Sequence, residues 1–289
     1  MGAQDTPSPS GRRAVVFGEA LIDVFPDRRV VAGAPLNVAC HLAALGWEVE
    51  LVTRLGADAD GARVQETLRA LGVGQALVEI DDELPTGVVS VAMDGTSHTF
   101  AIHGPSAWDR IAGPPALPAH DVFCYGSLAA RSAVSRTTLG RLLGLSRAPL
   151  RVFDVNLRPP HVDVDALATG LAAATVVKVN GEELEKVADL LGFQPDAAGY
   201  FAAAPDLGWL CVTRGEEGAE VYGRSGEAWS AAPPPVRIVD SVGAGDAFVA
   251  AFVGSLGTGA DVDAALGAGI AVSSAVLQQR GGLPAARVV

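Results

Sequence analysis

Asp240-Ser241-Val242-Gly243-Ala244-Gly245-Asp246 stands between an extended β-branched run, Val236 to Val239, and an apolar stretch with helical spacing, Ala247 to Leu256. The segment predicts a glycine-rich loop that enters a helix. Two glycines around one alanine allow consecutive backbone N–H groups to face one point, and the helix dipole adds positive potential there. Such a loop can bind an oxyanion, or a phosphoryl group in transfer, without any lysine.

Asp246 closes this segment, in the first turn of the predicted helix. Its carboxylate can accept a proton from a hydroxyl group directed at the same point, which is the role of a general base. An early aspartate also stabilises a helix through the dipole, so the motif alone is equally compatible with an ordinary helix start. The candidate reaction centre therefore consists of Asp246 and the backbone of Gly243, Ala244 and Gly245.

Strand-like and helix-like segments alternate along most of the chain, which predicts a doubly wound α/β core around a parallel sheet. The predicted core strands are Arg13–Phe17, Val49–Val52, Val122–Tyr125, Arg151–Asp154, Val176–Val179 and Trp209–Thr213. The predicted helices are Asn37–Leu45, Asp60–Leu71, Ser135–Leu145, Ala166–Ala174, Gly181–Leu191, Ala247–Leu256 and Val262–Leu277. A hairpin is expected around Glu220 to Trp229.

A small β-sheet lid is expected from two segments, near residues 24–32 and 85–104. Ala76–Ile80, Gly87–Met93 and Thr96–Ile102 are predicted to be antiparallel strands, with a hairpin turn at Asp94-Gly95. Residues 1–12 are polar and rich in proline and serine, which predicts a disordered N-terminal tail. Residues 13–289 then form one domain.

Composition excludes several classes of protein. Lysine and arginine total 21 against 33 acidic residues, a formal charge of −12, so the surface repels nucleic acid. Three cysteines are too few and too far apart for a disulfide framework, which favours a reducing cytoplasm. An apolar run long enough for a membrane span is missing from the sequence, and neither lysine, Lys178 or Lys186, lies in a G-x-x-x-x-G-K-[ST] loop.

The chain resembles the PfkB (ribokinase-like) carbohydrate kinases from about Ala14 to Leu283. The segment Asp240–Asp246 matches the family signature D-[TS]-x-G-A-G-D throughout. Further motifs follow in the family's order: Gly18–Asp23, Ala32–Ala39, Asp154–Pro159, Asn180–Glu183 and Thr213–Gly218. The resemblance implies a ribokinase-like α/β/α sandwich with a β lid, and ATP-dependent transfer of the γ-phosphoryl group to a sugar hydroxyl, with Asp246 as the base and the Gly243–Gly245 amides as the anion hole.

Candidate sugar-binding residues come from the early motifs. Asp23 and Asn37 supply acceptors and donors suited to sugar hydroxyls, and Gly33 allows a substrate to approach the backbone. Asp23 could instead simply end a strand, and Asn37 could cap the following helix. The run Asp154-x-Asn156-x-Arg158 is similar to that of fructokinases and 2-keto-3-deoxygluconate kinases, and it makes Asn156 a substrate candidate.

Arg158 is a candidate for binding phosphate or carboxylate oxygens, since a guanidinium suits both, although it could be an ordinary surface arginine. His103 lies where many fructokinase-like members carry an arginine, so it is a candidate lid contact to the sugar, or a residue with no role. Gly33-Ala34-Pro35 is the fructokinase-like form of the early motif, which makes fructose the leading acceptor. Ala32 replaces the usual first glycine there, which would cause strain if that position needed a positive φ.

Candidate nucleotide and metal residues lie later in the chain. Asn180 and Glu183 are one helical turn apart and could face a phosphate-bound Mg²⁺ through water, but the same spacing fits a capping box. Thr213, Gly215 and Gly218 resemble the family's nucleotide-side loop. Asp240 occupies the family position near a monovalent-cation site, which would take K⁺.

Several hypotheses about substrate, activity and assembly remain open. The acceptor could be 2-keto-3-deoxygluconate, another sugar or a nucleoside in place of fructose. The chain could also be a sugar or nucleotide sensor that keeps the fold without turnover, although the intact Asp246 argues against this. Edge strands of the lid could pair in a homodimer.

Overall fold

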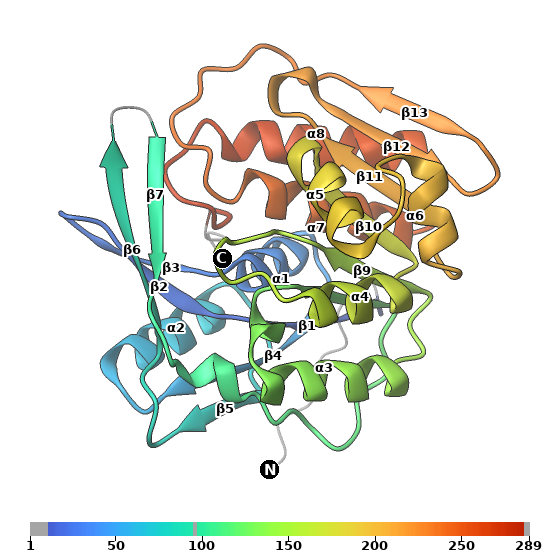
Figure 1. Ribbon diagram of the computed structural model, residues 1–289. Coiled ribbons are helices and arrows are strands. Elements are labelled where there is room, and N and C mark those ends of the chain that lie inside the picture. Colours follow the sequence, from blue (N-terminus) through green and yellow to red (C-terminus); the bar gives the residue numbers. More distant parts are fainter. Residues whose placement is uncertain (1–10, 95–96, 286–289) are drawn as a thin grey trace.

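The structure is a computed structural model that describes residues 11–94 and 97–285. Within these residues, one sheet of nine strands forms the centre of the molecule (Figure 1). Its spatial order is β13 (Ala228–Ala231), β12 (Ala219–Gly223), β11 (Trp209–Thr213), β10 (Val176–Asn180), β9 (Leu150–Asp154), β8 (Val122–Gly126), β1 (Arg13–Phe17), β4 (Glu48–Gly56) and β5 (Val78–Asp81). The strands from β11 to β5 are parallel, and β12 and β13 add an antiparallel edge.

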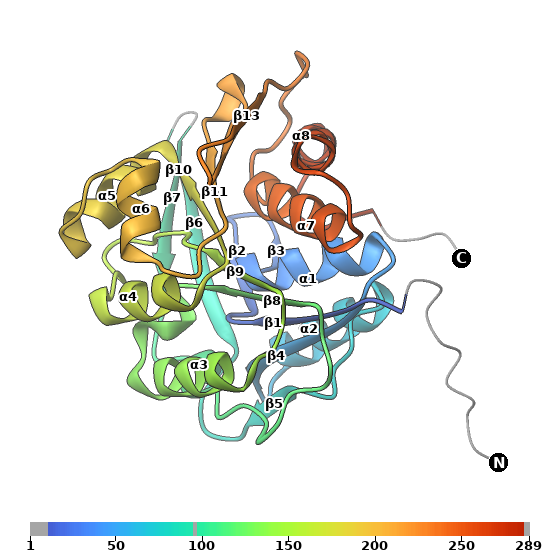
Figure 2. The ribbon, with the colours of Figure 1, turned by 90° about the vertical axis from the view of Figure 1, so that its right-hand side faces the viewer.

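Helices cover both faces of this sheet, as Figure 2 shows from the side. One face carries α1 (Ala34–Ala44), α2 (Ala59–Ala70), α7 (Ala244–Gly257) and α8 (Val262–Val276), and the other carries α3 (Ala133–Leu145), α4 (Val164–Ala173), α5 (Gly181–Leu191) and α6 (Ala197–Ala203). Short 3₁₀ turns lie at Ala107–Arg110, Ala129–Arg131 and Gly215–Glu217. Both faces of the strands are apolar because each packs on helices: Ala14 and Val16 of β1 join one core cluster, and Val15 and Phe17 join the other.

A second sheet forms the lid, in the order β3 (Arg29–Ala32), β2 (Leu21–Val24), β6 (Gly87–Asp94) and β7 (Ser97–Ile102). It combines two segments that are far apart in the sequence, as predicted. The β2–β3 and β6–β7 pairs are antiparallel, whereas β2 and β6 are parallel. A small apolar cluster that includes Leu21, Phe25 and Val89 holds the two segments together.

The prediction that the segment Ala76–Ile80 is an antiparallel strand grouped with the lid hairpin is wrong. The strand β5 is parallel to β4 and belongs to the main sheet. The helix α2 connects the two strands, and a strand that returns after such a crossover runs parallel to the first.

Two other segments differ from the sequence-based expectation. The β-branched run Val236–Val239 joins no sheet; it connects β13 to the glycine-rich loop, and Val239 N–H donates to the carbonyl of Leu277. The helix α6 was not predicted, because it is short and its start depends on the Asp196 side chain, which accepts from Gly199 N–H. The predicted tail, apart from Gly11 and Arg12, and the turn residue Gly95 lie outside the described residues.

The strand order reverses direction at β1, because the chain first adds β4 and β5 on one side of it and then β8 on the other. Ligands of doubly wound proteins bind at the carboxyl ends of the strands next to such a switch point. Among the described helices, none combines the length and apolar character needed to cross a bilayer.

Candidate active site

The helix α7 begins at the switch-point edge without a side-chain cap. Its N-cap is Gly243, with φ 77°, and a Cβ at that position would lie 2.3 Å from the Cα of Gly282. A glycine is therefore required by both backbone conformation and space. Because no side chain closes this terminus, the first-turn amides and the positive end of the dipole are available to an anion.

The glycine-rich loop is held by contacts with the C-terminal segment. The two carboxylate oxygens of Asp240 accept from Val242 N–H and Gly281 N–H, both at 3.0 Å. The buried ring of His41 lies with Nε2 2.9 Å from the carbonyl oxygen of Gly282. Asp240 is thus an anchor of the loop, at the position that the resemblance associates with a monovalent cation.

Asp246 lies in the first turn of α7, and its Oδ2 accepts from the Nδ2 of Asn37, at 2.7 Å. Asn37 is 4% exposed, and its buried Oδ1 has no partner among the described residues, so it can still accept from a ligand hydroxyl. Desolvation and the nearby charge of Asp154 raise the pKa of Asp246 to about 6, against the opposing effects of Asn37, Lys178 and Arg158. An aspartate with a raised pKa is a stronger proton acceptor than an ordinary one, which suits a general base.

Two more buried acids lie in this region: Glu19 is affected by the charge of Asp246, and Asp23 by that of Asp240. Burial raises the pKa of Glu19 to about 7 and that of Asp23 to about 6, and the Arg158 guanidinium partly offsets both shifts. Arg158 is exposed, at the mouth of this group, while Glu19 and Asp23 are buried. The arginine is therefore a counter-charge for the acids as well as a candidate for contacting phosphate.

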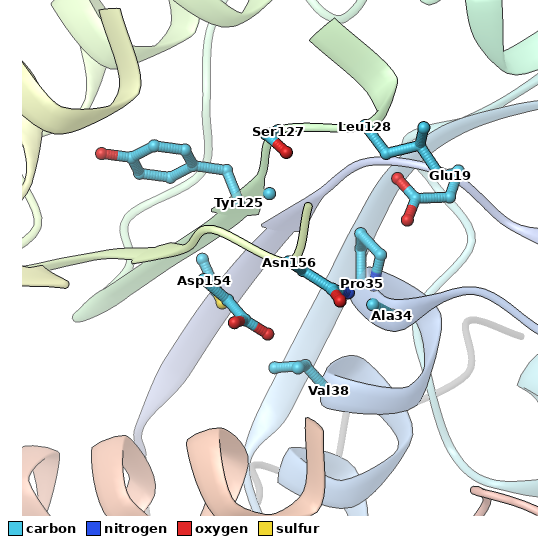
Figure 3. A pocket seen from close by; sticks show the side chains of 11 residues that line it. Glu19, Ala34, Pro35, Val38, Tyr125, Ser127, Leu128, Asp154 and Asn156 are labelled. Atoms are coloured by element: carbon cyan, nitrogen blue, oxygen red, sulfur yellow. The ribbon is translucent and has the colours of Figure 1, made fainter. Parts of the chain in front are cut away.

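A small cavity of about 10 Å³ lies at the switch point itself, which is room for roughly one water molecule. Figure 3 shows the carboxylates of Glu19 and Asp154 and the amide of Asn156 in this cavity, beside Pro35 of α1. Asn156 has φ 46°, a left-handed conformation that is uncommon for a residue other than glycine and is often found at functional sites. The ends of β1, β8 and β9 thus meet where the strand order reverses.

Lys178 is a site residue that the sequence reasoning missed. It lies in β10 beside Asp154 of β9, and its Nζ is 3.1 Å from Asp154 Oδ1, with both side chains less than 10% exposed. A Cβ on Gly245 would lie 3.3 Å from Nζ, so the ammonium is directly beneath the glycine-rich loop. A lysine inside the apolar run Val176–Val179 was the available signal, because buried lysines are almost always paired.

The predicted nucleotide-side residues border one cleft of about 600 Å³ with the glycine-rich loop. Thr213, Gly215 and Gly218 lie on one side, and Ala244 and Gly245 lie on the other. The remaining lining is largely apolar and includes the Pro233–Val236 segment, Ile238, Phe248 and Ile270. The cleft combines an apolar chamber with an anion-binding helix terminus, an arrangement that suits a nucleotide.

Asn180 and Glu183 form the capping box of α5. The Asn180 side chain accepts from Glu183 N–H, and Glu183 Oε2 accepts from Asn180 N–H, both at 2.8 Å. The other oxygen, Oε1, accepts from Leu157 N–H, also at 2.8 Å. Both carboxylate oxygens of Glu183 therefore accept from backbone N–H groups, so any contact with a cation would run through water. Among the described residues, no group of three His, Cys, Asp or Glu side chains is arranged to hold a metal.

The other predicted residues lie as follows. Gly33 is the N-cap of α1, with φ 124°, where a Cβ would lie 2.5 Å from the Glu19 carbonyl oxygen. Ala32 belongs to β3 and does not have a positive φ, so the anticipated strain does not arise. His103 is exposed at the end of β7, and its Nε2 pairs with the Ser90 hydroxyl at 2.7 Å.

A doubly wound α/β fold with a lid, an uncapped helix terminus and a carboxylate at that terminus together define a phosphoryl-transfer protein. Residues 12–286 match the model of the pfkB family carbohydrate kinases, and the chain belongs to this family. It is a phosphotransferase that uses an alcohol group as acceptor.

Individual relatives agree with this family. The chain is 33% identical to a fructokinase of Escherichia coli over 86% of each chain. It is 30% identical to an aminoimidazole riboside kinase of Salmonella typhimurium, over 81% of this chain and 77% of the relative. The crystal structure of a fructokinase from Vibrio cholerae O395 with fructose, ADP and calcium ion bound matches with a TM-score of 0.80 and 26% identity, over 94% of this chain and 95% of the other.

Proposed function

We propose that this protein is an ATP-dependent fructokinase. The observation that carries the proposal is the Asn37–Asp246 hydrogen bond beside the uncapped start of α7, because it combines a hydroxyl-binding amide, a base and an anion site. Fructose is favoured because the E. coli relative is a fructokinase and because the Gly33-Ala34-Pro35 and Asp154-x-Asn156-x-Arg158 motifs are of the fructokinase-like type.

The sugar binds between the lid and the end of α1. Asp23 and Asn37 bond its hydroxyls, Gly33 lets it approach the backbone, and Asn156 contacts it from the end of β9. His103 reaches it from the lid. The buried acceptor Oδ1 of Asn37 and the solvent-shielded carboxylate of Asp23 support these roles, because both gain from a hydroxyl donor.

The nucleotide occupies the cleft of about 600 Å³, with its base against the apolar lining and its phosphates at the start of α7. Thr213, Gly215 and Gly218 border the base and ribose, and the amides of Gly243, Ala244 and Gly245 face the γ-phosphate. Asn180 and Glu183 would hold a nucleotide-bound Mg²⁺ through water, and the ion would supply neutralisation of the phosphate charge. Asp240 would stand beside K⁺.

Asp246 performs the proton transfer. Its carboxylate accepts the proton of the attacking sugar hydroxyl, while the helix terminus stabilises the negative charge of the migrating phosphoryl group. Arg158 adds positive charge at the mouth of the site. The closed lid excludes water, which would otherwise compete with the sugar as acceptor.

A nucleoside is the second candidate acceptor, because an aminoimidazole riboside kinase is among the relatives. A coupled ADP-release assay over fructose, 2-keto-3-deoxygluconate, ribose, tagatose, adenosine and aminoimidazole riboside separates the candidates. We expect the highest kcat/KM with fructose. A higher kcat/KM with another acceptor would identify that acceptor, and not fructose, as the substrate. Thermal shifts on adding these ligands, without ADP release from any of them, would identify a sensor.

The three cysteines, Cys40, Cys124 and Cys211, are buried and free, which suits a reducing cytoplasm, and we propose that location. The lid sheet ends at the edge strands β3 and β7, and pairing at such an edge would form a homodimer. Size-exclusion chromatography with light scattering tests this assembly.

A further inference from the structure

The buried charges around Asp246 do not balance. Glu19 and Asp154 are buried and Asp246 is half-buried, so three carboxyl groups lie together, whereas Lys178 is a buried cation beside them and Arg158 lies exposed at the mouth. Burying a carboxylate is costly unless it is paired, so the arrangement of these charges determines which acid stays ionised.

One ion pair, between Asp154 and Lys178, lies on the side of these charges that faces the sheet. The two side chains extend from neighbouring positions of β9 and β10 toward the face that carries α7, and they meet at 3.1 Å. Burial disfavours the charged lysine, but Asp154, Glu183 and Asp246 together raise its pKa above the ordinary value. Lys178 and Asp154 are thus the two partners of one buried ion pair.

The pair lies under the start of α7, because Nζ would be 3.3 Å from a Cβ on Gly245, the residue before Asp246. Two of the three ammonium protons are not needed for Asp154, and they are free to face the loop. A cation placed at the positive end of a helix is unfavourable by itself. The paired Asp154 compensates for it, and at the same time its charge raises the pKa of Asp246.

We propose that Asp154, in its buried ion pair with Lys178, is a positioning residue for the base: it strengthens Asp246 as a proton acceptor, while the ammonium supports the Gly243–Gly245 loop. The inference rests on the proposed role of Asp246. By Coulomb's law, an anion near Asp246 makes the carboxylate hold a proton more tightly, and a cation makes it hold the proton less tightly. The two partners of one ion pair thus act on the base in opposite directions.

The other charged or titratable groups around Asp246 are few. Glu19 follows β1, Cys124 lies in β8 and Arg158 lies in the loop after β9; the pKa values of Glu19 and Cys124 are both raised in part by the charge of Asp246. On α1, Asn37 bonds Asp246, and His41 faces Gly282 instead. The Asp154–Lys178 pair is thus the ion pair among the charged groups that face Asp246 from the sheet.

The test is the pH dependence of kcat/KM. In the wild type, activity falls as the pH drops through about 6, because Asp246 must be deprotonated to act. We call the fall of kcat/KM at low pH the acid limb of the profile. Asp154→Asn removes the like charge, so we expect the acid limb to move to lower pH by about one unit. Lys178→Met removes the cation, so we expect the limb to move to higher pH, and the double variant to lie between the two.

Two matched controls separate this effect from general damage. Lys186→Met changes the chain's other lysine, which is 58% exposed on α5, and Asp81→Asn breaks a different buried ion pair, with Arg54 at the β4–β5 edge. Both should leave the acid limb in place.

If Lys178→Met does not fold, Lys178→Gln is the second variant, because its amide can still donate to Asp154. An acid limb that stays in place in Asp154→Asn and in the lysine variant, or that moves in the same direction in both, overturns the inference. The proposed function is tested separately by Asp246→Asn. Near wild-type turnover of this variant would show that Asp246 is not the base, whatever the pH profiles of the other variants show.

Discussion

The helices α5 and α7 both begin at the carboxyl edge of the main sheet, yet their first turns are built differently. At α5, Asn180 and Glu183 satisfy each other's backbone N–H groups, so the terminus is closed by its own side chains. At α7, Gly243 has no side chain and the first turn is left open. The described helices α2, α4, α6 and α8 resemble α5, because each starts with an aspartate that accepts the N3 amide.

The difference shows that the start of α7 lacks the stabilising cap of α5 and in exchange leaves its backbone N–H groups free to bind a ligand. A side-chain cap contributes about 1 kcal/mol to a helix, and it also occupies the donors that an anion would need. Only an uncapped terminus offers those donors to a phosphate. The helix α7 compensates through its surroundings: Asp240 of the loop accepts from Gly281 N–H of the C-terminal segment, and the buried His41 of α1 contacts the Gly282 carbonyl of the same segment.

The largest expected effect is at the open terminus. Asp246→Asn keeps the shape of the side chain but cannot accept the hydroxyl proton, so kcat should fall by at least about 10²-fold while the protein folds normally. Steady-state ADP release measures the loss, and a thermal melt confirms folding. Near wild-type turnover would rule out Asp246 as the base.

A second variant compares two glycines that share one backbone conformation. Gly243 and Gly192, the C-cap of α5, both have φ 77°, but a Cβ at Gly192 meets nothing within 4 Å, whereas at Gly243 it lies 2.3 Å from Gly282 Cα. Gly192→Ala should cost about 1–2 kcal/mol of stability with normal kcat. Gly243→Ala should cost more and lower kcat about tenfold, since the loop amides move off their target.

Denaturant unfolding and ADP-release kinetics measure the two effects for each glycine variant. Equal losses of stability and unchanged kcat in both variants would show that the position of the glycine-rich loop does not matter for turnover.

The smallest effect should come from the closed terminus. Asn180→Ala removes the cap, so the free energy of unfolding should fall by about 1 kcal/mol. If Asn180 also faces phosphate-bound Mg²⁺, the KM for the metal–nucleotide complex should rise as well. Asp261→Ala, which removes the matched cap of α8, is the control and should lower stability alone. An unchanged KM in Asn180→Ala would reduce Asn180 to its capping role.

The elements of the fold were largely predictable, because short continuous apolar runs indicate strands buried on both faces, and helical spacing indicates the helices that cover them. The lid was predicted in outline, but Ala76–Ile80 was misplaced because a short apolar strand carries no mark of which sheet it joins. In the site, Asp246, Asn37 and Asp23 could be singled out through local motifs. Glu19 and Lys178 were not singled out: a charge next to or within an apolar run signals a buried group, but its role is visible only when its partner is known.

By itself the sequence determined the alternation of elements, the glycine-rich start of α7 and membership in a carbohydrate kinase family, since these depend on residues adjacent in the chain. The tertiary structure decided that Asn37 meets Asp246 across 209 positions, and that Lys178 lies beneath the same loop, paired with Asp154. The physical reason is that burial and charge pairing depend on distances in space, which strand order sets and local sequence does not encode.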